Sequence, residues 1–473
     1  MAGYGNVIHW FRRDLRLSDN TALLQATRDS EKVLPVYISS DWKGEHHWTG
    51  PARQAFLCGC LESLSKNIDH AGGRLIFRRG HAVEELEKLI DESEAEAVYC
   101  NRDPDPYGKE MEKRVRELCR NKGIAFHDLQ DAVLHEKDEV LTNSGGPYKV
   151  YTPYSRTWFD QEKSAVQDTV RTIHTLTTIR KGSVPTVSDW GLPYEGELLR
   201  TPGEKAARQR LKQAIDEVIG EYEGMRNDPA ADATSHLGAD LRYGTLSVRE
   251  VFHEAEQARE RARSESTRSS IHTFQKQLGW REFFMAILGH FPEVLETDFN
   301  ADWRGLDWDD PGKDDRFEHW KAGKTGFPIV DAGMRQLAET GYMHNRVRMI
   351  TAMFLTKDLH IHWKEGESHF LQHLLDGEIA NNNGGWQWSA GTGADAAPYF
   401  RIQNPWTQTD RYDKNGEYIK RWLPELEKVD SKRFTKPPED DRPLAPDYVL
   451  PIVDHKTERD ETLRRFKAHK EKG

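Results

Sequence analysis

The sequence has few cysteines, no long apolar run and no excess of positive charge. Its four cysteines are Cys58, Cys60, Cys100 and Cys119, all in the first quarter of the 473 residues. They show neither the pairing pattern of a disulfide-bonded secreted domain nor the spacing of metal ligands, so we expect buried thiols and no bound metal. Because the sequence contains no apolar run of about eighteen residues and no charged-then-apolar leader, we expect a cytoplasmic protein without a membrane anchor.

The formal net charge is -11, which is unfavourable for a protein that binds a phosphate backbone. A nucleic-acid partner therefore requires that basic side chains gather around one opening, because net charge does not describe a single face. A Gly-x-Gly-x-x-Gly dinucleotide fingerprint after the first strand is also absent. The length predicts two domains, with room to bury a large cofactor.

The first part of the chain alternates short apolar runs with amphipathic segments. The runs that predict strands are 7–10, 33–38, 74–77, 95–100 and 124–129, and those that predict helices are 51–71, 82–91 and 106–122. This alternation is typical of a parallel, Rossmann-like sheet covered on both faces. We expect an α/β domain over residues 1–132 and a linker rich in glycine and proline over 133–202.

From residue 203 to 473 the periodicity is helical, which predicts an all-α domain. The clearest helical segments are 209–220, 247–263, 270–290, 330–340, 346–359 and 367–375.

The stretch from Asp376 to Asn404 combines amides, glycines and tryptophans, and its periodicity does not predict a regular element. Gly384 and Gly385 would let the backbone approach a bulky planar group, and the amides of Asn382 and Asn383 could face its edge. Trp386 and Trp388 offer ring faces. We expect a ligand-binding loop here, and the alternative is a tight turn with core tryptophans.

Four further segments carry candidate functional side chains. Phe11–Asn20 follows the first strand, and Thr234–Gly238 precedes a helix, where hydroxyls and backbone amides suit an anionic group or act as an ordinary cap. Gln277–Phe284 places an amide, an indole and a guanidinium on one helix face, which suits a splayed base or an ordinary structural tryptophan. Gly341–Met349 carries two arginines and a histidine, which could also be surface charge.

Taken together, these segments resemble the DNA photolyase and cryptochrome family, most closely the bacterial class I enzymes that repair cyclobutane pyrimidine dimers. The resemblance is strongest over Asp376–Asn404, where it runs almost residue for residue. It implies an antenna-type α/β domain followed by a helical domain that binds FAD. Relatives with an iron–sulfur cluster carry its cysteines in the helical domain, and this chain has no cysteine after Cys119.

The resemblance also implies roles for individual residues. The residues that would bind FAD are Tyr222, Thr234, Ser235, His236, Leu237, Gly238, Arg348, Asp376, Gly377, Glu378 and Asn382. Arg348 would pair with Asp376, and Asn382 would lie beside flavin N5. Trp386, Trp363 and Trp308 would conduct electrons between the flavin and the surface.

The DNA lesion would meet a second set of side chains. These are Arg226, Gln277, Trp280, Arg281, Asn345, Arg346, Met349 and Trp388. Class I enzymes usually have glutamate at Gln277, and an amide differs from a carboxylate in what it donates and accepts. Relatives that repair (6-4) photoproducts have histidines at Asn345 and Met349, whereas ring opening by electron transfer needs no general acid.

The antenna pigment is the least determined part of this interpretation. Asn101–Gly108 departs from the pattern of folate-binding members, so we expect 8-hydroxy-5-deazaflavin rather than methenyltetrahydrofolate, with no second pigment as the alternative. His46, His47 and Trp48 could line its pocket or decorate a loop.

The function that we predict is a monomeric deoxyribodipyrimidine photo-lyase acting on DNA that contains pyrimidine dimers. The alternatives are a cryptochrome-type photoreceptor without repair activity, a (6-4) photolyase, and a flavoprotein unrelated to light.

Overall fold

The computed structural model describes residues 3–44, 46–192, 194, 196, 198–396, 398–439 and 442–471. The chain divides into two compact units, which we describe one at a time. The first unit comprises Met1–Glu221 and Ser235–His290, and the second comprises Tyr222–Thr234 and Phe291–Gly473. The three-part division at residues 132 and 202 stays a prediction.

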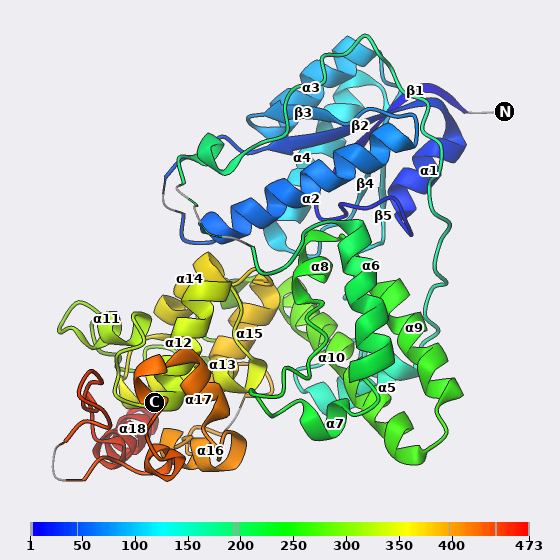
Figure 1. The fold of residues 1–473 in the computed structure, drawn as a ribbon. Helices are drawn as coiled ribbons and strands as arrows, with labels where there is room; N and C mark the ends of the chain where they lie inside the picture. The colour runs from blue at the N-terminus through cyan, green and yellow to red at the C-terminus, as the bar shows by residue number, and fades with distance from the viewer. Residues whose placement is uncertain are drawn as a thin grey trace. The chain divides into compact units, whose positions relative to one another are not determined.

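The first unit is built on a five-stranded parallel sheet (Figure 1). In chain order the strands are β1 (Tyr4–Phe11), β2 (Ser30–Ser39), β3 (Ile76–Arg79), β4 (Ala97–Asn101) and β5 (Ala125–Leu129). Their order in the sheet is β3-β2-β1-β4-β5, so the direction of winding reverses between β1 and β4. The predicted parallel, Rossmann-like sheet is confirmed.

Helices cover both faces of this sheet. They are α1 (Thr21–Asp29), α2 (Pro51–His70), α3 (Ala82–Ser93) and α4 (Pro106–Lys122). The apolar residues of α3 and α4 pack on one face, and α1 and α2 lie on the other (Figure 1). The sequence analysis did not predict α1, which Asn20 caps by accepting a hydrogen bond from the Leu23 amide.

Three of the four thiols, those of Cys60, Cys100 and Cys119, are buried, and Cys58 is half-buried. Burial raises the pKa of each thiol, so all four remain protonated and unreactive at neutral pH.

The segment after β5 joins the sheet to the remaining helices of the first unit. Between residues 161 and 186 it forms no helix or strand, and its His174 carbonyl accepts a hydrogen bond from the Val33 amide. The helices are α5 (Tyr151–Asp160), α6 (Glu204–Gln213), α8 (Gly238–Tyr243), α9 (Val248–Arg261) and α10 (Glu265–His290). A buried network holds them to the sheet, in which Arg249 pairs with Asp19 and Asp131.

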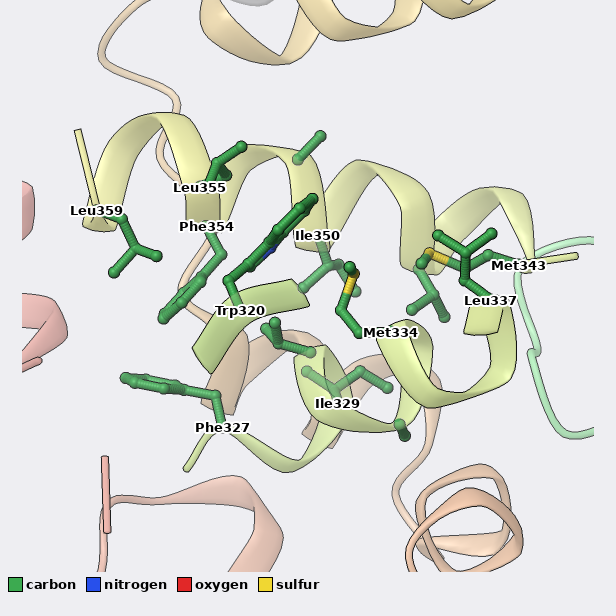
Figure 2. Packing of buried hydrophobic residues seen from close by; sticks show 14 of the residues in the cluster. Trp320, Phe327, Ile329, Met334, Leu337, Met343, Ile350, Phe354, Leu355 and Leu359 are labelled. Carbon is green, nitrogen blue, oxygen red and sulfur yellow. The ribbon is translucent and has the colours of Figure 1, made fainter. Parts of the chain in front are cut away.

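The second unit is helical in the residues that the structure describes. Its helices are α7 (Tyr222–Met225), α11 (Arg316–Lys321), α12 (Pro328–Thr340), α13 (Asn345–Met353), α14 (Trp363–His373), α15 (Ile379–Ala390), α16 (Pro405–Tyr412), α17 (Glu417–Trp422) and α18 (His455–Lys470). Figure 2 shows its core, in which Trp320 lies between α12 and α13. A π-helical turn, Phe354–Asp358, continues α13.

One prediction of local structure is wrong. Asp376–Asn404 is not a loop throughout, because Ile379–Ala390 forms the helix α15. One face of α15 is half-buried and carries Asn382, Gly385 and Trp388, while the buried positions include Asn383, Gln387 and Ser389 as well as apolar residues. Because polar side chains occupy part of the buried face, the helix has no continuous apolar stripe, and the rule of periodicity missed it.

Among the described helices, none combines the length and the apolar composition that spanning a bilayer requires. The described residues also contain no group of three histidine, cysteine or acidic side chains arranged to hold a metal.

Candidate functional site

In the second unit, α15 is held against α14 by its buried amides. Asn383 Nδ2 donates to the Val294 carbonyl and to Glu367 Oε1, both at 3.0 Å. Asn382 Nδ2 donates to the Glu367 backbone carbonyl at 3.0 Å. Because a carbonyl only accepts, this bond fixes the orientation of the Asn382 amide and leaves Oδ1 as an acceptor for a ligand.

Glu367 is a member of this site that the sequence analysis missed. Its carboxyl group is buried beside the two amides, and burial raises its pKa to about 7. Asn383 and Lys364 act in the opposite direction, and Glu296 adds to the rise. The group therefore titrates near neutral pH within hydrogen-bonding distance of α15.

The ion pair that the resemblance implies is present. Arg348 Nη2 lies 2.9 Å from Asp376 Oδ2, and Arg348 Nε donates to the Met343 carbonyl at 2.7 Å. The second oxygen, Asp376 Oδ1, is buried and has no hydrogen-bond partner in the described part of the chain. A buried carboxylate oxygen without a donor is costly unless a ligand supplies one.

Another cluster joins Tyr222, Thr234 and Tyr342. The hydroxyl groups of Thr234 and Tyr342 lie 3.0 Å apart. Burial raises the pKa of Tyr222 to about 12, Arg226 opposes this rise and Tyr342 adds to it. These polar groups are therefore close together, as an anionic ligand would require.

The unit boundary passes between Thr234 and Ser235, so Ser235–Gly238 are described with the first unit. His236 has a positive φ of 54° and its Nδ1 bonds to Arg200. Leu237 is buried before Gly238, which begins α8.

The three tryptophans of the predicted electron pathway also belong to the second unit. Trp363 and Trp386 are buried, and Trp308 is half-buried. A Cβ atom at Gly366 would lie 2.1 Å from Trp386 Cη2, so the Trp386 ring rests directly on the backbone of α14. Gly366 is one turn after Trp363 on the same face, which places the two indoles near each other.

The ring of His362 contacts both Trp308 and Trp363. Its ring centroid lies 5.4 Å from that of Trp308 and 5.1 Å from that of Trp363. Its Nδ1 accepts a hydrogen bond from the Lys364 amide and caps α14. Burial lowers the pKa of His362, so the ring is neutral at pH 7.

The predicted lesion-binding residues divide between the units. In the first, Trp280 stacks on Tyr151 at a centroid distance of 3.7 Å, and its ring also contacts Phe283 and Phe284 at 5.7 and 5.6 Å. Gln277 Nε2 donates to the Thr273 carbonyl at 3.2 Å, and Arg281 donates to the Ala132 carbonyl at 2.9 Å. The guanidinium of Arg281 is thus partly occupied by protein.

In the second unit, Arg346 lies at the centre of a basic cluster, which consists of Arg226, Arg346 and Arg411. Arg346 Nη2 donates to Asn227 Oδ1 at 2.8 Å, and its guanidinium lies 4.7 Å from the Tyr412 ring centroid. Burial lowers its pKa, and Arg226 and Arg411 add to that effect. The salt bridges of the described residues include none from these three arginines.

The remaining candidates of this unit lie on α13 and α15. Asn345 is exposed at the start of α13, Met349 is half-buried with its sulfur 3.5 Å from Arg346 Nη1, and Trp388 is half-buried on α15. Gly377 and Glu378 connect α14 to α15, with Glu378 buried as the N-cap residue. The sequence analysis did not single out Asn227, Arg411 or Tyr412, because side chains that meet from distant parts of the sequence leave no periodic signal.

In the first unit, the carboxyl ends of β1 and β4 are filled by protein side chains. Asn101 donates to Asp14 and accepts from the Ala22 amide, and Arg13 pairs with Asp103 and Asp105. The segment Asn101–Gly108 therefore serves the fold.

An aromatic cluster follows the carboxyl end of β2. Trp42 lies 4.7 Å from His46 and 6.1 Å from Trp190, measured between ring centroids. His47 stacks on His46 at 5.1 Å, and Trp48 meets His47 edge-on at 5.5 Å.

Comparison with known proteins places this geometry in context. Residues 7–171 match the family described as DNA photolyase, and residues 274–468 match the family described as the FAD binding domain of DNA photolyase. The deoxyribodipyrimidine photo-lyase of Synechococcus sp. is 38% identical over 95% of this chain and 94% of its own length. That of Agrobacterium fabrum is 40% identical over 98% of each chain.

Solved structures agree with these matches. The bacterial class III photolyase of Agrobacterium tumefaciens has a TM-score of 0.91 and 39% identity, covering 99% of this chain and 98% of that one. The archaeal photolyase of Sulfolobus tokodaii, solved with two FAD molecules, has a TM-score of 0.85 and 28% identity, covering 98% and 100%.

Proposed function

Because this chain belongs to the DNA photolyase family, we propose that it is a deoxyribodipyrimidine photo-lyase that opens cyclobutane pyrimidine dimers in DNA. Light-driven DNA repair with FAD follows from the family, and the choice of lesion is the finer step. Asn345 and Met349 carry that choice, because an amide and a thioether cannot act as the general acid that (6-4) chemistry needs. Assignment to class I stays a prediction.

The test uses two oligonucleotides, one with a cyclobutane dimer and one with a (6-4) photoproduct. Blue light and the reduced holoprotein should restore the pyrimidines of the first and leave the second unchanged. Repair of the (6-4) product alone would reverse the choice of lesion. Repair of neither would favour the cryptochrome-type photoreceptor.

The residues of the second unit fit an FAD molecule. Bound FAD supplies the electron that light excites. Asn382 Oδ1 can accept a hydrogen bond from the reduced ring, and Asp376, fixed by Arg348, has one buried oxygen available for a donor. We assign Tyr222, Thr234 and Ser235–Gly238 to the diphosphate side, where hydroxyls and amides suit an anion.

Contacts to DNA phosphates are assigned to the basic cluster. Its three guanidinium groups lack carboxylate partners among the described residues, so their charge is available to phosphates. Replacing Arg346 by Gln should lower the slope of log affinity against log salt by about 1. Arg464→Gln is a matched control, because Arg464 is exposed and already paired with Glu461. Equal salt slopes for the wild type and Arg346→Gln would contradict the assignment.

The electron pathway through Trp386, Trp363 and Trp308 re-reduces the oxidised flavin under light. Trp386→Phe should slow photoreduction and spare repair by the chemically reduced enzyme. Trp406→Phe, a buried tryptophan of the same core, should leave photoreduction unchanged. Photoreduction at the wild-type rate in Trp386→Phe would refute the pathway.

The antenna pigment is assigned to the aromatic cluster of Trp42, His46, His47, Trp48 and Trp190, and we propose 8-hydroxy-5-deazaflavin. At the carboxyl ends of β1 and β4, protein side chains already occupy the space through ion pairs and hydrogen bonds. This supports placing the pigment in the aromatic cluster instead. The Sulfolobus tokodaii photolyase was solved with two FAD molecules, so a second FAD is one of the pigments that the experiment must distinguish. Chromatography of the pigments released from the holoprotein tests the choice, and folate or FAD alone would contradict it.

A cytoplasmic location and a monomeric state complete the proposal. Sedimentation equilibrium of the holoprotein should give the mass of one chain, 54.5 kDa. A dimer would refute the monomer.

A further inference from the structure

The indole of Trp363 donates its hydrogen bond to a carboxylate. Trp363 Nε1 lies 2.8 Å from Asp298 Oδ1. The Trp363 side chain is fully buried, and Asp298 is 4% exposed. The Asp298 backbone carbonyl accepts from Arg304 Nε at 2.9 Å, which fixes the position of the residue. The two groups are 65 residues apart in the sequence, so nothing local requires the contact.

The surroundings of this carboxylate are unusual for a buried anion. Within the described residues no lysine or arginine forms a salt bridge with Asp298, and Arg304 reaches only its carbonyl. Asp298 also acts on His362, whose pKa falls through burial while Asp298 opposes that fall. Lys364 also faces His362, but it pairs with Glu296. A buried carboxylate normally has a cationic partner or several donors.

Other buried indoles of this protein show what a purely structural bond looks like. Trp320 Nε1 donates to the Thr351 carbonyl at 3.2 Å, so a neutral acceptor is sufficient. Trp158 does donate to a carboxylate, that of Glu282, but Glu282 also accepts from two backbone amides. Asp298 differs from Glu282 in two respects. Among the described residues, the Trp363 indole is the hydrogen-bond donor to its carboxylate, without backbone amides beside it. That indole also belongs to the proposed electron pathway.

We propose that Asp298 stabilises the oxidised form of Trp363 and accepts its proton, an inference that rests on the proposed electron pathway. With FAD bound as the light-driven electron acceptor, Trp386 would lose one electron to it, and Trp363 would then give one electron to Trp386. The N–H bond of the Trp363 radical cation breaks, and its proton moves to Asp298 Oδ1. A neutral indole radical and a neutral carboxylic acid remain, so charge and atoms balance.

This transfer favours charge separation for two reasons. A carboxylate beside an indole lowers the energy of the indole cation, because a buried charge pair is only weakly screened. Once the proton has moved, the returning electron meets a neutral radical and must wait for the proton to return. The electron that reached the flavin is therefore retained longer.

The experiment is flash absorption spectroscopy of the FAD-loaded protein, which distinguishes the indole cation radical from the deprotonated neutral radical. Asp298→Asn keeps the size of the side chain and an acceptor oxygen, but it removes the charge and the basic site. We expect the cation radical to persist in this variant and the yield of photoreduced flavin to fall about tenfold, as for loss of one charge-assisted hydrogen bond. Asp302→Asn, on the exposed turn that follows, is the matched control.

The wild-type protein provides a second measurement that needs no variant. If the proton goes to Asp298, the rate of radical deprotonation should be independent of buffer concentration and should slow in deuterated water. A rate that rises with buffer concentration would mean that the solvent takes the proton, and it would overturn the proposal.

Trp363→Phe separates this inference from the pathway on which it rests. If Trp363→Phe abolishes photoreduction while Asp298→Asn matches the wild type in spectrum and yield, Asp298 has no such role. If Trp363→Phe leaves photoreduction intact, the pathway itself is wrong, and the role of Asp298 falls with it.

Discussion

Replacing Glu367 by Gln tests the electrostatics of the site without any ligand. Glu367 is buried on α14, and burial raises its pKa from the ordinary value of 4.5 to about 7. Its Oε1 accepts from Asn383 at 3.0 Å, a bond that a glutamine carbonyl can also accept. The substitution therefore preserves the shape and the acceptor and removes only the titration.

The sign and the magnitude follow from proton binding. Between pH 4.5 and pH 7 the unfolded chain has lost this proton while the folded protein keeps it, so the free energy of unfolding falls as the pH rises. The rise in pKa corresponds to a loss of about 3 kcal/mol in the free energy of unfolding. This loss is complete above pH 7, and below pH 4.5 there is none. Glu367→Gln avoids this loss, because an amide has no proton to release.

Urea unfolding of the wild type and the variant at pH 5 and pH 8 measures the effect. The variant should gain about 2 to 3 kcal/mol relative to the wild type between these two pH values. Glu365→Gln, exposed two residues earlier on α14, is the matched control and should shift nothing. If the wild type and Glu367→Gln respond to pH in parallel, the carboxyl group is ionised in the folded protein and the reasoning is refuted.

Three further substitutions test particular contacts. Gly366→Ala should cost about 1–3 kcal/mol of unfolding free energy and slow photoreduction, because its Cβ would overlap the Trp386 ring; unchanged photoreduction would contradict that placement. Gly385→Ala, whose Cβ meets no protein atom within 4 Å, should stabilise the flavin-free protein by about 0.5–1 kcal/mol and weaken FAD binding in a titration. Unchanged affinity would show that the space is not used by the flavin. Burial lowers the pKa of Lys357 from 10.5 to about 7, so Lys357→Met should stabilise by about 5 kcal/mol at pH 6, with a gain that shrinks towards pH 10; a gain independent of pH would refute this.

The sheet and its helices were predictable because their signals are local. The predicted helix 106–122 has the bounds of α4, since Asp105 caps it, Pro106 occupies the first position and Gly123 ends it with a positive φ of 72°. The central strands β1 and β4 are apolar runs that are largely buried on both faces, which composition identifies, whereas the edge strand β5 is half-buried. The sequence analysis does not predict α1, because the helix is only nine residues long and directly follows the loop motif Phe11–Asn20.

The site was predictable only where the resemblance extended. The resemblance implies the pair of Arg348 and Asp376, and the structure contains it. Glu367, His362 and Asp298 were not, because each acts through a partner that spacing cannot identify. The separation from Asp298 to Trp363 is set by packing, and periodicity describes neighbours on one element only.

The face of α14 that meets α15 positions both the Trp386 ring and the amides of Asn382 and Asn383. Gly366 and Glu367 each lie three or four residues from both Trp363 and Phe370, so the four residues lie on one face of the helix. Gly366 and Phe370 contact the Trp386 ring, the latter at a centroid distance of 4.9 Å, and Glu367 holds both amides of α15. One helix face thus sets the position of an electron donor and of the amide assigned to flavin N5. A displacement of α14 cannot alter one without altering the other, so substitutions on this face should change photoreduction and flavin affinity together.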